Sequence, residues 1–141
     1  MVFVPFTGID NHKSSVTLAA GLISNEDVES YSWLLECFKK SVGSQPIVLV
    51  TDQDPALKIA IPRVFPNSKH RYCMWHITEK LKAKVGVSLS RDTDFLKDIS
   101  SAIWTNHVCE DDFTEQWNSV IAKYHLEDNT WLSDIYANRS C

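Results

Sequence analysis

The chain has 141 residues, of which 44% are hydrophobic and 23% charged, with a net charge of −4. This composition is typical of a globular protein with one hydrophobic core. No apolar run approaches the roughly 18 residues that cross a bilayer, and the N-terminus lacks a basic signal-peptide region, so we expect no membrane span. The four cysteines show no disulfide spacing, which predicts reduced thiols in an intracellular protein.

The first part of the chain is predicted to form a hairpin, a helix and a strand. Residues 1–7 and 15–22 are rich in apolar residues and flank a polar turn, which predicts an antiparallel pair. Ser24 and the acids after it predict a helix start, and Gly43 predicts its end. Residues 47–50 form an apolar run that leads to Asp52. This order predicts a mixed α/β sheet.

The next part is predicted to form helices around one more short strand. Asp54 and Pro55 predict a helix start, and Pro62 is expected to kink or end that helix. Residues 68–72 predict a strand and residues 74–85 a helix, and from Arg91 onward only helical patterns appear. Four tryptophans lie among helical stripes and are expected to be core residues: Trp75, Trp104, Trp117 and Trp131.

Basic residues are concentrated in one part of this acidic chain. Residues 58–84 contain seven Lys or Arg residues and a single acidic residue, Glu79. Such a patch is typical of a phosphate-facing surface, and the alternative is a solvated helix face. Charge alone favours the solvated face.

Asp52 is the first candidate for chemistry, because it follows a buried strand. In open α/β sheets, functional side chains gather at the carboxyl ends of strands. The alternative is a loop or helix-capping residue. Asp54 is better explained as the N-cap of the following helix, and Asp10 as part of the hairpin turn.

Several stretches form an ordered set of motifs that extends over nearly the whole chain. They are Phe3–His12, Thr51–Ala56, Val64–Asn67, His70–Ile77 and the Trp-Leu-x-x-Ile-Tyr-x-x-Arg pattern of Trp131–Arg139. Together they resemble the Mutator-like transposase domain. The version that they resemble most is that of the plant far-red-impaired-response family, whose members are transcription factors derived from such transposases.

The resemblance implies an RNase H-like fold. Residues 1–85 would form its mixed sheet, incomplete at the N-terminus, and residues 86–141 a truncated all-helical insertion. In active members, two Asp and one Glu hold two divalent ions, Mg²⁺ or Mn²⁺, for phosphoryl transfer on DNA. Asp52 matches the second Asp, whereas the other two carboxylates would fall before Met1 and after Cys141. One carboxylate does not hold two metals, so we expect this chain not to cleave DNA.

Cys73 and His76 form a Cys-x-x-His pair that resembles a signature of the same family. A zinc site would need two more ligands, for which His70, His107 and Cys109 are available. Without a second pair at ligand spacing, we expect no zinc and a structural role for the pair at a strand-to-helix junction. The candidates for DNA contact are Lys69, His70, Arg71, Lys80 and Lys84.

The sequence therefore predicts a catalytically inactive, transposase-derived domain of a nuclear DNA-binding transcriptional regulator. DNA would be its partner in the full-length protein, with a homo- or heterodimer of related proteins as a further option. We expect neither a membrane nor a small-molecule substrate. Two alternatives stay open: a fragment of an active DNA transposase, and a non-functional remnant with exposed sheet edges.

Overall fold

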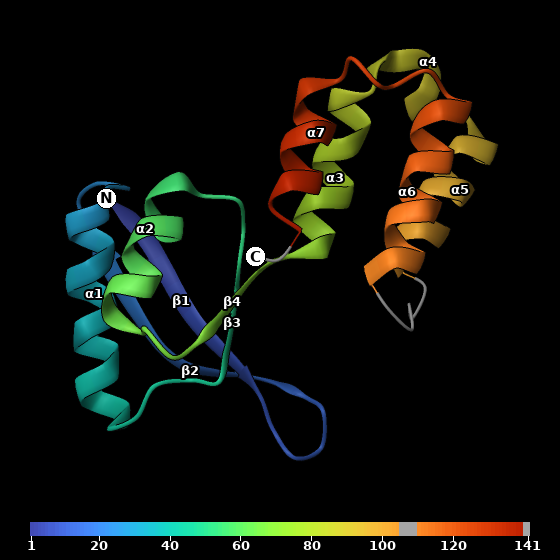
Figure 1. Cartoon of the computed structure of the whole chain (residues 1–141). Helices are drawn as coiled ribbons and strands as arrows, with labels where there is room; N and C mark the ends of the chain where they lie inside the picture. The colour runs from blue at the N-terminus through green and yellow to red at the C-terminus, as the bar shows by residue number, and fades with distance from the viewer. Residues whose placement is uncertain (105–109, 140–141) are drawn as a thin grey trace. The chain divides into compact units, whose positions relative to one another are not determined.

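The computed structural model describes residues 1–104 and 110–139, which form two compact units, 1–73 and 74–139 (Figure 1). The boundary between them follows Cys73, whereas the sequence predicted it after Val85. It lies earlier because Leu81 packs with Phe95 and Leu132 in the core of the second unit. The helix that contains Leu81 therefore belongs with the helices that follow it.

The first unit contains four strands and two helices in the order β1, β2, α1, β3, α2, β4. Strands β1 (Val2–Ile9) and β2 (Ser15–Ile23) form an antiparallel hairpin, as predicted. Strands β3 (Val48–Thr51) and β4 (Lys69–Tyr72) are parallel and are joined through α2 (Pro55–Val64). Helix α1 (Val28–Val42) follows the hairpin.

These strands form two separate two-stranded sheets, β1–β2 and β3–β4, instead of the one mixed sheet that the sequence predicted. A tight turn connects β1 to β2, and α2 connects β3 to β4. No described strand lies between β1 and β3 to join the pairs. The RNase H-like fold thus stays a prediction.

Both sheets nevertheless share one hydrophobic core with α1 and α2. Val4 of β1, Ile23 of β2 and Leu49 of β3 pack on the same cluster of buried side chains. That cluster includes Leu34 of α1 and Phe65 after α2, which is fully buried. Figure 1 shows the two helices on the same side of the strands. Alternation along each strand then places every second side chain on the opposite, outward side.

Helix ends in the first unit follow capping chemistry, with two differences from the prediction. The N-cap of α1 is Asp27 rather than Ser24, because the Asp27 carboxylate accepts the Ser30 N–H at 2.8 Å. Gly43 ends α1 with φ 76°, a conformation that suits glycine. Pro62 does not end α2, which continues to Val64, because a proline in the last turn removes only one helical hydrogen bond.

The second unit consists of helices only. They are α3 (Met74–Lys84), α4 (Gly86–Ser90), α5 (Thr93–Trp104), α6 (Glu110–Lys123) and α7 (Thr130–Ala137). Trp117 is buried in their core and Trp131 packs against it, as predicted. Trp75 and Trp104 are 62% and 58% exposed, so the prediction that they belong to the core is wrong. Among the described residues, no helix has the length and apolar character that a membrane span needs.

Candidate functional site

The tip of β3 carries the carboxylate that the sequence singled out. Asp52 follows the last residue of β3, Thr51, and is exposed. The backbone N–H of Cys73 donates to the Thr51 carbonyl at 2.6 Å and extends the β3–β4 pairing to this point. The carboxylate therefore projects from a strand end that backbone hydrogen bonds hold in place.

A side-chain hydrogen-bond chain supports the same tip. The Thr51 hydroxyl donates to the Asp52 carbonyl at 2.8 Å, and the His70 Nε2 lies 2.8 Å from the Thr51 oxygen. Because the hydroxyl has a single hydrogen, it must accept from His70, which requires a proton on Nε2. The half-buried His70 ring also meets Tyr72 edge-on, with ring centroids 5.4 Å apart. His70 thus links the β4 side of the pair to the tip of β3.

The surroundings of His70 favour its neutral form. Burial lowers the pKa of His70 below its ordinary value, and the positive charges of Arg71 and Lys58 lower the pKa further. The hydrogen bond to Thr51 needs a proton on Nε2, and the neutral Nε2–H tautomer supplies one without a buried charge. The ring is therefore a structural donor at this site rather than a cation directed at solvent.

The loop after Asp52 is held by the start of α2. The Asp54 carboxylate accepts the Ala56 and Leu57 N–H groups at 2.7 and 3.0 Å, so it acts as the N-cap that the sequence predicted. Tyr31 of α1 is buried nearby, and its pKa rises to about 12 through burial and the negative charges of Asp54, Glu26 and Asp52. Tyr31 is consequently protonated at neutral pH and can only add a neutral hydroxyl to the site.

The Cys73–His76 pair lies where the chain leaves β4 and enters α3. Cys73 is half-buried and free, and His76 is exposed, with its ring edge-on to Trp75 at 4.9 Å. Within the described residues, no three His, Cys, Asp or Glu side chains are grouped to hold a metal ion. His107 and Cys109, two of the ligands considered for zinc, lie outside the described residues.

The basic candidates for DNA contact fall into three structural settings. Lys69 and Arg71 point outward from β4, whereas His70 points inward and contacts Thr51. Lys80 and Lys84 are exposed on α3 of the second unit. The five residues that the sequence grouped by charge are therefore divided between the two units, and His70 lies on the inward side of β4.

Comparison with known proteins identifies the family. The family model described as the MULE transposase domain matches residues 1–80, which is more than half of the chain. The chain belongs to the MULE transposase domain family. No solved structure matches it significantly.

Curated relatives of this MULE domain are plant proteins. FAR1-RELATED SEQUENCE 4 of Arabidopsis thaliana is 35% identical over 138 residues, which are 96% of this chain and 19% of that protein. FAR-RED IMPAIRED RESPONSE 1 of the same species is 27% identical over 135 residues, 95% of this chain and 16% of that protein. The resemblance to the far-red-impaired-response family is thus confirmed. The chain spans about a fifth of the length of these relatives.

Two residues of the MULE domain site were not singled out in the sequence. Thr51 was named only as the first residue of the Thr51–Ala56 motif, although a hydroxyl just before a strand-tip Asp is a signal for local hydrogen bonding. Tyr31 lies within the helix that the sequence predicted between Ser24 and Gly43. Its position near Asp52 depends on how α1 packs, which no local pattern gives.

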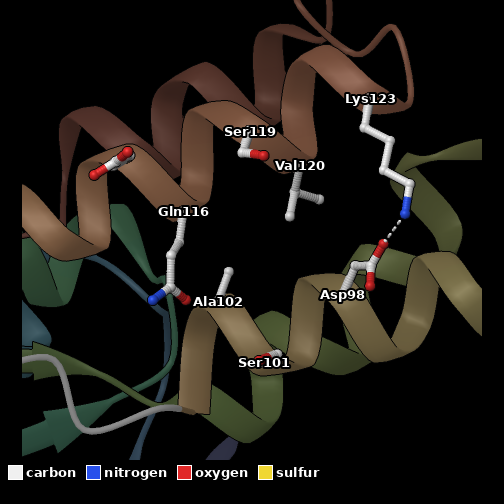
Figure 2. A pocket seen from close by; sticks show the side chains of 8 residues that line it. Asp98, Ser101, Ala102, Gln116, Ser119, Val120 and Lys123 are labelled. Atoms are coloured by element: carbon white, nitrogen blue, oxygen red, sulfur yellow. Dashed lines mark hydrogen bonds and ion pairs between the residues drawn. The ribbon is translucent and has the colours of Figure 1, made fainter.

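A separate groove lies between α5 and α6 in the second unit, with a volume of about 430 Å³ (Figure 2). Six of the eight residues that line it are polar or charged, and they include Ser101, Gln116 and Ser119. At one end, Lys123 donates to Asp98 at 2.6 Å, and Figure 2 shows this pair joining the two helices. The groove contains none of the predicted site residues.

Proposed function

We propose that this MULE domain is a catalytically inactive, DNA-binding part of a nuclear transcriptional regulator. The observation that carries the proposal is similarity over nearly the whole chain to proteins named for far-red impaired response, combined with the transposase family match. The chain covers only a part of those proteins, so the activity of the whole proteins is assigned to it only within this proposal.

The proposed lack of catalysis rests on the carboxylates around Asp52. Two metal ions about 4 Å apart need several carboxylate ligands. Asp54, the neighbouring acid in the chain, already accepts two backbone N–H groups as an N-cap. We infer that Asp52 is an inherited ligand position that does not hold two ions in this chain.

The proposed DNA contact is one row of side chains on α3. His76, Lys80 and Lys84 follow at steps of four residues and are all exposed. Steps of four place them along one side of the helix, at a rise of about 6 Å each. Lys82, on a neighbouring part of the helix surface, is 3.3 Å from Glu79. The row therefore presents basic groups that can contact successive phosphates.

Charge reversal tests this contact. The double variant Lys80→Glu/Lys84→Glu should weaken binding to a labelled DNA duplex and reduce the slope of log K against log salt by about 0.9 for each lost phosphate contact. The matched control is Lys40→Glu/Lys97→Glu, which changes net charge equally at exposed lysines of α1 and α5. Equal weakening by both double variants would mean that net charge alone drives binding, and would reject the α3 contact.

The RNase H-like sheet is a further part of this proposal. An antiparallel hairpin followed by a parallel β–α–β unit, all on one core, is consistent with two parts of such a sheet. An experimental structure of the full-length protein would test it. A strand paired with both β1 and β3 is expected, and a structure in which the two pairs lie in different domains would reject the fold.

A further inference from the structure

One side chain, that of Asn129, joins the end of α3 to the start of α7. The Asn129 Oδ1 accepts the Leu132 N–H at 3.0 Å, and this bond forms the N-cap of α7. The Asn129 Nδ2 donates to the carbonyl of Lys84, the last residue of α3, at 3.0 Å. Because Leu132 offers a donor and Lys84 an acceptor, only this orientation of the amide satisfies both groups. We call these two hydrogen bonds the Asn129 clasp.

The clasp acts at a helix end that needs a partner. The last four carbonyls of an α-helix have no hydrogen-bond donor within the helix, and a terminal turn without support opens readily. Helix α3 ends at Lys84, and the chain turns at Gly86, whose φ is 85°. The Asn129 side chain therefore supplies at Lys84 the hydrogen bond that a further turn of α3 would have given.

Helix α7 can hold the end of α3 because α7 is itself fixed at both ends. Near its start, Leu132 is buried in the core that it shares with α3. Near its other end, the Tyr136 hydroxyl donates to the Thr114 hydroxyl of α6 at 3.1 Å. Arg139, just after α7, pairs with Glu110 of α6 at 2.8 Å. The Trp-Leu-x-x-Ile-Tyr-x-x-Arg pattern of the sequence thus anchors α7 on other helices of the second unit.

We propose that Asn129 is a positioning residue for the DNA contact of α3 and holds Lys84 in the row that begins with His76. The direction of a helical side chain follows from the backbone that carries it, and the clasp fixes that backbone at Lys84. Lys80 and His76 lie one and two turns earlier, where hydrogen bonds within α3 hold the backbone. The clasp therefore governs the last cation of the row and leaves the first two residues in place. This inference rests on the DNA contact proposed above.

The test replaces Asn129 by serine in the whole chain. Serine is as good an N-cap as asparagine, so α7 keeps its start, but its side chain is one bond shorter and loses the donor to Lys84. Binding to a labelled DNA duplex should weaken, and the slope of log K against log salt should fall by up to about 0.9, the value of one phosphate contact. Asn129→Ser should have no further effect on binding in a Lys84→Met background and its full effect in a Lys80→Met background. The matched control is Asn118→Ser at an exposed position of α6, which should bind as the unchanged chain does.

A second measurement reads the clasp without DNA. The Val85 N–H donates to the Leu81 carbonyl at 3.1 Å, so its hydrogen exchange reports the last turn of α3. Exchange at Val85 should be faster in Asn129→Ser than in Asn118→Ser, and equal exchange would overturn the clasp. Equal weakening of duplex binding in the two lysine backgrounds would show a general loss of stability and overturn the positioning role, as would unchanged binding by Asn129→Ser. If the lysine variants of α3 all bind duplex as the unchanged chain does, the DNA contact itself is rejected, whereas faster Val85 exchange would still support the clasp.

Discussion

Replacing Gly21 by alanine should destabilise the first unit, because α1 approaches β2 closely at this position. A Cβ at Gly21 would lie 2.3 Å from the Leu34 Cδ1 and 3.3 Å from its Cγ. Comfortable carbon–carbon contacts are about 3.5–4.0 Å. Leu34 is only 6% exposed, so its side chain has little open space into which to move. The new methyl group therefore forces a change of rotamer or a shift of α1.

Two opposing effects determine how much unfolding free energy Gly21→Ala should lose. Adding a methyl group to a packed core costs about 1–3 kcal/mol. Replacing glycine in an ordinary strand conformation returns about 0.4–1 kcal/mol by restricting the unfolded chain. The expected net loss in unfolding free energy is about 1–2 kcal/mol. Leu34→Ala alone should cost about 2–5 kcal/mol through the cavity that it leaves.

Hydrogen exchange of the amides in α1 and β2, measured on the whole chain, reports the stability of this unit. The double variant Gly21→Ala/Leu34→Ala should lose less than the sum of the single variants, because the new methyl enters the space that Leu34 vacates. Gly8→Ala is the matched control: its Cβ would meet Leu18 at 3.0 Å, but Leu18 is 57% exposed and can swing away. Unchanged protection in Gly21→Ala, or additivity in the double variant, would refute the packing argument.

Three further predictions concern core, cap and charge. Phe95 is fully buried in the helical core, so Phe95→Ala should lower the stability of the second unit by about 3–5 kcal/mol. Hydrogen exchange of the amides in β1 and β2 should stay unchanged. Loss of protection in both units would contradict separate cores. Asp54→Ala should cost about 1 kcal/mol through the lost N-cap, read from exchange in α2, with Asp54→Asn as the near-neutral control. A hydrogen bond from Lys123 lowers the pKa of Asp98, so the stability that this pair adds is present above about pH 4 and is lost as pH falls through the lowered pKa. Carboxyl NMR titration should show the Asp98 pKa rising in Lys123→Met, and an unchanged pKa would reject the pair.

Local chemistry in the sequence was enough to predict most elements of the fold. The hairpin, the Asp54 cap and the Gly43 helix end each depend on a few neighbouring residues, and all three are present. Pro62 was expected to kink or end α2, but it stands in the last turn, where it removes only one helical hydrogen bond, and the helix continues to Val64. The place of α3 in the second unit depends instead on packing between distant residues, because Leu81 packs with helices later in the chain.

The candidate site was predictable only in part, for a similar reason. The position of Asp52 at a strand end follows from the sequence around it. The hydrogen bond between His70 and Thr51 requires the parallel register of β3 and β4, in which Leu49 lies opposite His70. In this pairing His70 lies on the inward side of β4 and Lys69 and Arg71 on the outward side, although the three basic residues are consecutive in the sequence. Charge counting cannot distinguish the inward from the outward side of a strand before the pairing is known.

A DNA nicking assay tests the central claim most directly, because it asks whether Asp52 still supports chemistry. Purified chain and its Asp52→Asn variant would be incubated with supercoiled plasmid and Mg²⁺ or Mn²⁺, with duplex binding measured in parallel. The account predicts that neither protein nicks the plasmid and that both bind DNA equally. Nicking by the unchanged chain that disappears in Asp52→Asn would contradict it and would identify an active transposase site.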